Sequence, residues 1–210
     1  MAAVKSIPQV LQGSQTGEGE GRVGGVLLVC TANQIRSPMA ERLLVHGLTR
    51  KFGPVADSVV VMSSGLRAGV GQPLHPLAAA ELELLGVPAD GHRSALIDAG
   101  VVERAHLVLT ATRAQRDEVI AMVPCALTHA FTLRELAWLL DGLGPHDVPG
   151  KHLAVRVSRL PEVARPQRGM VVPLAPEAYD IDDPVGGARQ DYVRAANEIE
   201  AAVTSVLAVL

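Results

Sequence analysis

Aromatic residues, cysteine and long apolar runs are all scarce in this sequence of 210 residues. With two Phe, two Tyr and one Trp, the 48% of hydrophobic residues must build a core mainly from Ala, Val and Leu. The two cysteines are too few for a disulfide framework, which indicates a reducing compartment and therefore the cytoplasm. No apolar run reaches the roughly 18 residues that a membrane-spanning helix requires, so we expect no membrane partner.

Charge and histidine spacing exclude further classes of protein. The formal net charge of -3 is mildly acidic, which argues against nucleic acid as the main partner. The seven histidines show no metal-ligand spacing with cysteines or carboxylates, and the glycines form no nucleotide-binding fingerprint. We therefore expect neither a metal nor another cofactor.

The chain divides into a tail, a domain and one inserted segment. Residues 1–22 are polar and rich in Gly and Gln, without the apolar stretch of a signal peptide, and we interpret them as a flexible tail. Residues 23–210 have a length that suits one domain. Within it, 142–178 is rich in Pro, Gly and basic residues and interrupts the surrounding pattern. We interpret 142–178 as an insertion before the last helix, with a short helix at about 151–160.

Apolar runs alternate with helical patterns along the rest of the domain. The patterns predict strands at 24–30, 58–65, 105–111 and 127–133, and helices at 37–52, 76–87, 113–123, 134–143 and 188–210. This alternation predicts an α/β fold, a single domain with a four-stranded parallel sheet flanked by helices on both sides. Ser37 is the expected N-cap of the first helix, and Pro38 fits its first turn.

The loop after the first predicted strand carries the strongest chemical signal. Cys30 ends the strand, and Arg36 follows just before the predicted helix. Ligands of parallel sheets bind beyond the carboxyl ends of the strands. Unpaired N–H groups and the dipole at a helix start favour an anion there, and they favour a thiolate over a thiol. The fork of donors on Arg36 matches two oxygens of a phosphate, so we expect an oxyanion site with a sulfur nucleophile beneath it. The alternative is that Cys30 is only a small buried hydrophobic residue.

The whole stretch "LLVCTANQIRSPMAE" resembles the phosphate-binding loop of the bacterial low-molecular-weight protein tyrosine phosphatases. Further segments resemble the family in the family's own order: "VMSSGLRAGVGQPLHP", "LGVPADGHRSALI", "AHLVLTATRAQR", "FTLRELA" and "DIDDPVGG". The resemblance extends over about residues 23–205, apart from 142–178. It implies a phosphatase of the same α/β fold that needs no cofactor.

The resemblance also implies roles for individual residues. Cys30 is the nucleophile, Arg36 binds the phosphoryl oxygens, and Asp183, directly before a proline, is the general acid and then the base. The phosphate is held by the loop Thr31, Ala32, Asn33, Gln34, Ile35 and Arg36. Four residues support this loop and the nucleophile, namely Asn33, Ser37, Ser63 and His92.

Ala32 stands where the family commonly has glycine in the loop, which is a small change, and two further positions depart more from the family pattern. Ile35 stands where many members carry a second cysteine, so a disulfide within the loop is impossible, and Cys125 is expected to be structural. Val185 stands where members often carry an aromatic residue that stacks on phosphotyrosine, which weakens this stacking. We expect the insertion 142–178 to supply the missing wall, because it precedes the segment with Asp183.

Three functions stay open at this point. The first is a phosphomonoesterase of the protein tyrosine phosphatase type, acting on a phosphotyrosine protein or a small aryl phosphate through a phosphocysteine, as a monomer or weak dimer. The resemblance implies a bacterial tyrosine kinase as its protein partner. The second is an arsenate reductase that uses an external small thiol, since Cys125 alone cannot supply the thioredoxin-coupled version. The third is a non-catalytic module that binds phosphoproteins.

Overall fold

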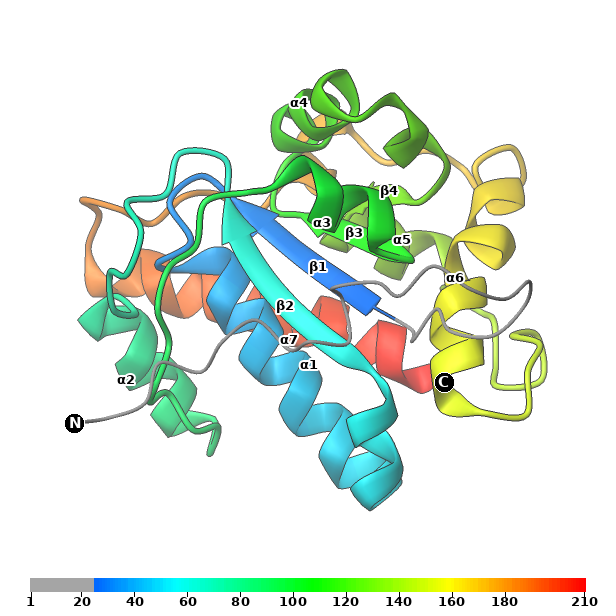
Figure 1. Ribbon diagram of the computed structural model, residues 1–210, viewed down its shortest axis with the longest axis horizontal. Helices are drawn as coiled ribbons and strands as arrows, with labels where there is room; N and C mark the ends of the chain where they lie inside the picture. The colour runs from blue at the N-terminus through cyan, green and yellow to red at the C-terminus, as the bar shows by residue number, and fades with distance from the viewer. Residues whose placement is uncertain (1–24) are drawn as a thin grey trace.

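The computed structural model describes residues 25–210, and the predicted tail at 1–22 lies outside the described residues (Figure 1). Four strands form one parallel sheet: β1 (Gly25–Cys30), β2 (Val60–Gly65), β3 (Leu107–Thr110) and β4 (Ala130–Thr132). Their order is β2-β1-β3-β4. In this register Cys30 lies beside Gly65, and Val29 lies beside Thr110. The carboxyl ends of three strands therefore meet around Cys30.

Helices cover both faces of the sheet, which confirms the predicted fold class. On one face lie α1 (Arg36–Phe52), α5 (Leu133–Leu139), α6 (Leu153–Gln167) and α7 (Arg189–Ala208), with α2 (Pro76–Leu84) packed beside α1 and α7. The other face carries α3 (Ala99–Arg104) and α4 (Arg113–Met122). Short 3-10 helices complete the chain: η2 (Gly53–Ser58), η3 (Pro124–Thr128) and η4 (Pro176–Tyr179).

The apolar run of β1 fits its place as one of the two inner strands of the sheet. All six of its residues are buried, as expected for a parallel strand covered on both faces. Val26 and Leu28 point into the larger core beneath α1, α6 and α7, whereas Leu27 and Val29 point into the smaller core beneath α3 and α4. Because alternate side chains of β1 are fixed in the two cores, the position of Cys30 at the end of the strand is fixed as well.

The insertion folds as part of the larger core. Its helix α6, longer than the predicted one, buries Leu153, Val157 and Leu160 against the sheet. Beyond the helix, Arg168 lies over the ring of Phe131 at 4.6 Å and pairs with Glu135 at 2.9 Å. These contacts tie the end of α6 to β4 and α5.

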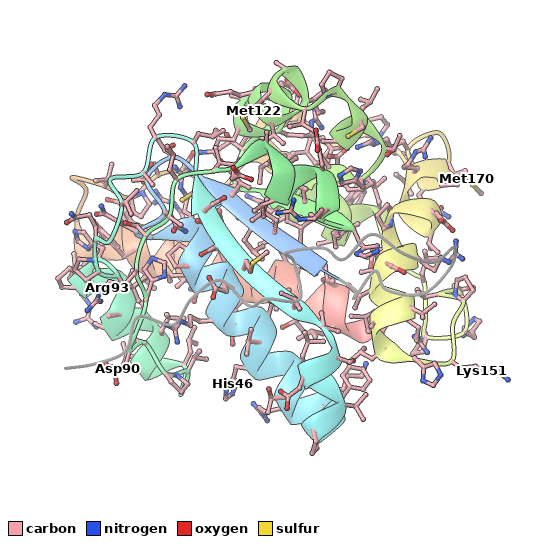
Figure 2. The ribbon with its side chains drawn as sticks, in the orientation of Figure 1. His46, Asp90, Arg93, Met122, Lys151 and Met170 are labelled. Atoms are coloured by element: carbon pink, nitrogen blue, oxygen red, sulfur yellow. The ribbon has the colours of Figure 1, made fainter. Side chains whose placement is uncertain are left out.

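The position of α6 does not agree with the expectation that this part of the segment 142–178 walls the phosphate pocket. Val157 and Leu160 share a cluster with Val26 and Leu107, which lie at the starts of β1 and β3. Figure 1 places α6 at that end of β1. In Figure 2, Lys151 and Met170, which flank α6, lie across the molecule from Arg93. The helix therefore lies far from the end of β1 that carries Cys30.

The part of the chain that the structure describes contains neither a helix that could span a membrane nor a group of side chains that suits a metal ion. Between residues 25 and 210, no helix combines the length and apolar character needed to cross a membrane. In the same range, no three His, Cys, Asp or Glu side chains gather in a way that suits a metal ion.

Candidate active site

The loop between β1 and α1 is shaped by Asn33. This buried residue has a φ of 55°, a left-handed conformation that asparagine tolerates better than most residues. Its Nδ2 donates to Ser37 Oγ at 3.0 Å and to Ser63 Oγ at 2.8 Å. Its Oδ1 accepts from the backbone N–H of Ala95 at 2.8 Å. Every polar atom of the amide thus holds the loop in one conformation.

His92 supports the same turn from outside the loop. Its Nε2 lies 2.7 Å from the carbonyl oxygen of Asn33, and because a carbonyl only accepts, Nε2 carries the hydrogen. Burial lowers the pKa of His92 below its ordinary value, although the bond to Asn33 opposes this change. The neutral imidazole therefore acts as a fixed donor.

Ser37 contacts the sulfur of Cys30 and does not cap the helix. The helix α1 begins at Arg36, with Ile35 at the N-cap position, so the predicted N-cap is wrong. The hydroxyl of Ser37 lies 3.0 Å from Cys30 Sγ and also donates to the carbonyl oxygen of Ser64 at 3.2 Å. This single hydrogen has two possible acceptors, the carbonyl and the sulfur. It can therefore turn to the sulfur when the sulfur carries negative charge.

Gly65, at the end of β2, is a site residue that the sequence analysis missed. A Cβ atom on it would lie 2.6 Å from Thr31 O and 2.8 Å from Asn33 N. Only glycine lets β2 approach the loop so closely. The two segments are also joined by hydrogen bonds from Leu66 N to Cys30 O and from Arg67 N to Thr31 O, at 2.9 and 2.8 Å.

The guanidinium of Arg36 is buried and points to the segment before α7. Its Nη1 donates to the carbonyl oxygen of Ile181 at 2.9 Å. Its Nη2 forms an ion pair with the carboxylate of Asp183, whose side chain is 37% exposed. Arg36 and Asp183, two of the three residues expected to be catalytic, are thus in direct contact, and Cys30 ends the strand before the loop that leads to Arg36.

Asp180, three positions before Asp183, contacts the start of α4. Asp180 Oδ1 accepts from Arg113 N, the first residue of α4, at 2.7 Å. This places a negative charge at a helix N-terminus, which is favourable. Asp180 thereby attaches the segment that carries Asp183 to the end of β3.

The position at which the family often has an aromatic ring is occupied by Val185. Val185 is 65% exposed, and it offers no ring for stacking. Across the loop, Arg67 and Glu118 form a two-pronged ion pair with distances of 3.0 and 2.9 Å. Because both side chains are exposed, this pair shapes the rim more than it stabilises the fold.

Thr31 and Gln115 are also joined at the site. Gln115, at the start of α4, donates from Nε2 to Thr31 Oγ1 at 3.0 Å, and Arg36 Nη2 approaches the same oxygen at 3.4 Å. Thr31 was predicted from the sequence as part of the phosphate loop, whereas Gln115 was not predicted as a site residue. The capping box formed by Thr112 and Gln115 was the available signal, although it predicts only a helix start.

Comparisons with known proteins give the family. The model of "Low molecular weight phosphotyrosine protein phosphatase" matches residues 25–139. A probable low molecular weight protein-tyrosine-phosphatase, EpsP, from Ralstonia nicotianae is 32% identical over 111 residues, which are 53% of this chain and 71% of EpsP. A protein-arginine-phosphatase from Geobacillus stearothermophilus is 32% identical over 117 residues, 56% of this chain and 74% of that protein.

Solved structures agree with this match. The YwlE arginine phosphatase from Geobacillus stearothermophilus has a TM-score of 0.61 and 26% identity, covering 88% of this chain and 90% of its own. The low molecular weight protein tyrosine phosphatase from T. tengcongensis has a TM-score of 0.63 at 21% identity, covering 89% and 99% of the two chains, and shows the same fold. This chain belongs to the low molecular weight phosphotyrosine protein phosphatase family.

Proposed function

We propose that Cys30, Arg36 and Asp183 carry out the family's cysteine-dependent hydrolysis of phosphate monoesters, with phosphotyrosine proteins or other aryl phosphates as substrates. The observation that carries this proposal is the ion pair between Arg36 and Asp183, beside the loop that follows Cys30, the last residue of β1. It puts the residue expected to bind phosphate in contact with the expected proton donor, next to the loop that follows Cys30.

In the first step, the sulfur of Cys30 attacks phosphorus. The S–P bond forms as the bond from phosphorus to the phenolic oxygen breaks, and Asp183 gives its proton to that oxygen. Backbone N–H groups of the loop and the guanidinium of Arg36 stabilise the charge of the transferring phosphoryl group. The products of this step are a free phenol and a phosphocysteine.

In the second step, a water molecule attacks the phosphocysteine. The carboxylate of Asp183 takes a proton from the water, the new O–P bond forms and the S–P bond breaks. The thiolate of Cys30 leaves, and the hydroxyl of Ser37, 3.0 Å from Sγ, donates a hydrogen bond to the thiolate. Inorganic phosphate is released.

The ion pair also orders these events. In the absence of substrate, the carboxylate of Asp183 occupies Nη2 of Arg36. A phosphate dianion needs the same nitrogen, because a guanidinium binds two oxygens with its fork of donors. Substrate binding therefore releases Asp183 from the arginine, and the freed carboxylate takes up a proton from solvent before it donates that proton to the leaving oxygen.

We propose a reducing compartment and a tyrosine-phosphorylated protein substrate for this chemistry. Cys30 must stay reduced to attack phosphorus, so we propose that the enzyme acts in the cytoplasm. Since EpsP and Wzb, two proteins to which this chain is similar, are named as protein-tyrosine-phosphatases, we propose a tyrosine-phosphorylated protein such as a bacterial tyrosine kinase as substrate.

Phosphoarginine is a second candidate substrate. The relative from Geobacillus stearothermophilus is named a protein-arginine-phosphatase. The charged pair of Arg67 with Glu118 favours this candidate, because charged side chains near the loop suit a polar leaving group, and Val185 offers no aromatic ring to an aryl group. An aryl group would instead gain from stacking on an aromatic wall.

One set of assays tests the proposal against its alternatives. Wild-type protein and Cys30→Ser are compared on p-nitrophenyl phosphate, a phosphotyrosine peptide and a phosphoarginine peptide, and on arsenate with a small thiol. We expect turnover of phosphorylated substrates by the wild type only, and the ratio of the two peptides identifies the substrate class. Equal rates for both proteins, thiol-dependent arsenate reduction alone, or tight binding without turnover would each overturn it.

A further inference from the structure

Gln115 is buried, and both ends of its amide are engaged. Its Oε1 accepts from Ala111 N and from Thr112 N, each at 3.1 Å. Backbone N–H groups only donate, so the oxygen must face them and the NH₂ group must face the other way. There Nε2 lies 3.0 Å from Thr31 Oγ1. The hydroxyl oxygen of Thr31 is therefore the acceptor in this bond.

These bonds are part of a closed ring around the guanidinium of Arg36. Arg36 Nη2 reaches Thr31 Oγ1 at 3.4 Å, and Gln115 links that oxygen to Ala111. Ala111 O in turn accepts from Ile181 N at 2.9 Å. Ile181 O accepts from Arg36 Nη1 at 2.9 Å, which closes the ring. One side of the ring is the phosphate loop, one is the end of β3, and one is the segment that carries Asp183.

We propose that Gln115 is a positioning residue for Arg36. It holds the hydroxyl of Thr31 as an acceptor for Nη2, and with the bond from Nη1 to Ile181 it fixes the plane of the guanidinium beside the phosphate loop. This inference rests on the proposed function, because a fixed guanidinium matters only where Arg36 binds phosphoryl oxygens. Donors fixed in advance stabilise developing charge without having to reorganise during the reaction.

Four variants of the full chain test the pair, with p-nitrophenyl phosphate as substrate and inorganic phosphate as inhibitor. Gln115→Ala and Thr31→Val should each lower kcat/KM by about tenfold and raise the inhibition constant of phosphate by a similar factor. The double variant should be no worse than the more damaging single one, because both act through the same bonded path to Arg36. Thr31→Ser, which keeps the oxygen, should recover most of what Thr31→Val loses.

A matched control separates positioning from helix capping. Thr112→Ala removes the other half of the α4 capping box, in which Thr112 Oγ1 accepts from Gln115 N at 3.3 Å. It should lower the melting temperature as Gln115→Ala does, because a lost cap destabilises a helix start. It should leave kcat/KM and phosphate inhibition at their wild-type values, since it touches neither Thr31 nor Arg36.

Two results would overturn the inference. One is that the losses in Gln115→Ala and Thr31→Val multiply in the double variant. The other is that Gln115→Ala matches Thr112→Ala, with a lower melting temperature and wild-type phosphate inhibition. If the wild type does not hydrolyse the ester, the proposed function fails by itself. Calorimetric binding of inorganic phosphate then decides the inference, which weaker binding by both variants supports and equal binding contradicts.

Discussion

Arg36 and Asp183 form an ion pair across 147 positions of the chain. The pair exists because β1 and α1 bury the arginine, while Asp180 and Ile181 attach the acidic segment to the end of β3. In the proposed mechanism the two partners must separate when substrate binds. Replacing Asp183 tests whether the two partners separate.

Asp183→Ala removes the proton donor and the competitor for Arg36 together. We expect kcat on a phosphotyrosine peptide to fall by about 10²–10⁴-fold, and by less on p-nitrophenyl phosphate, because nitrophenolate leaves readily without a proton. Inorganic phosphate should inhibit the variant more strongly than the wild type. Steady-state kinetics on both substrates measures this. An equal fall on both would show that Asp183 is not the acid.

Ser37→Ala removes the hydroxyl 3.0 Å from Cys30 Sγ. The thiolate then leaves the phosphocysteine without a hydrogen bond, so we expect the second step to slow by about tenfold. Rapid-quench experiments should show a larger burst of phenol before the steady state. A steady-state rate that falls with no increase in the burst would place the role of Ser37 in the first step.

Substitutions of Asn33 separate its backbone from its side chain. Both Asn33→Gly and Asn33→Ala lose the three side-chain hydrogen bonds, so both should lower kcat/KM. At a φ of 55°, alanine is strained and glycine is not. The free energy of unfolding of Asn33→Ala should therefore be about 1 kcal/mol below that of Asn33→Gly, as measured in urea. Equal stabilities would contradict the left-handed conformation.

His92 should make the stability of the protein depend on pH. Burial lowers its pKa in the folded state below the ordinary value of 6.5. Below 6.5, the unfolded chain therefore binds a proton that the folded chain does not. The contribution of neutral His92 is complete above 6.5 and is lost as the pH falls through the folded pKa. Urea unfolding between about pH 7.5 and 5 should show a smaller decrease in His92→Gln, which keeps a donor but does not titrate.

The insertion should contribute to stability and not to catalysis. Leu160, on α6, is 1% exposed. Leu160→Ala should lower the free energy of unfolding by about 2–5 kcal/mol, with kcat unchanged while the protein is folded. Val155→Ala, at a position 41% exposed on the same helix, is the control, with an expected change within about 0.5 kcal/mol. A large loss of kcat in Leu160→Ala would indicate a link from α6 to the phosphate loop.

The parts of the fold that depend on local pattern were predicted from the sequence. The apolar runs gave the parallel strands, and their alternation with helical patterns gave the layers. The helix α3 was missed, because six residues after an N-cap at Asp98 are too few for a periodic pattern. The helix α6 was predicted too short, because Pro161 and Pro166 lie inside it and proline usually ends a helix.

The site was predictable where chemistry concentrates in one segment. Cys30 and Arg36 follow from spacing, while Asp183 needed the resemblance to a family. Gly65 and Gln115 depend on strand register and on the position of α4, which no local pattern specifies. Ser37 was predicted as a support of the nucleophile and also as a helix cap, and only the cap was wrong, because its hydroxyl lies beside the sulfur of Cys30. The catalytic roles stay predictions until the variants are measured.

Ile35 has a consequence for exposure to peroxide. A peroxide would convert the sulfur of Cys30 to a sulfenic acid, which a neighbouring thiol can trap before further oxidation. Ile35 is buried and carries no thiol. Cys125 lies in η3, before the start of β4, whereas Cys30 is the last residue of the parallel strand β1, so the two cysteines lie near opposite ends of the sheet. Rescue of the oxidised enzyme therefore has to come from a dissolved reductant such as glutathione, and its activity would follow the redox state of the surrounding cell.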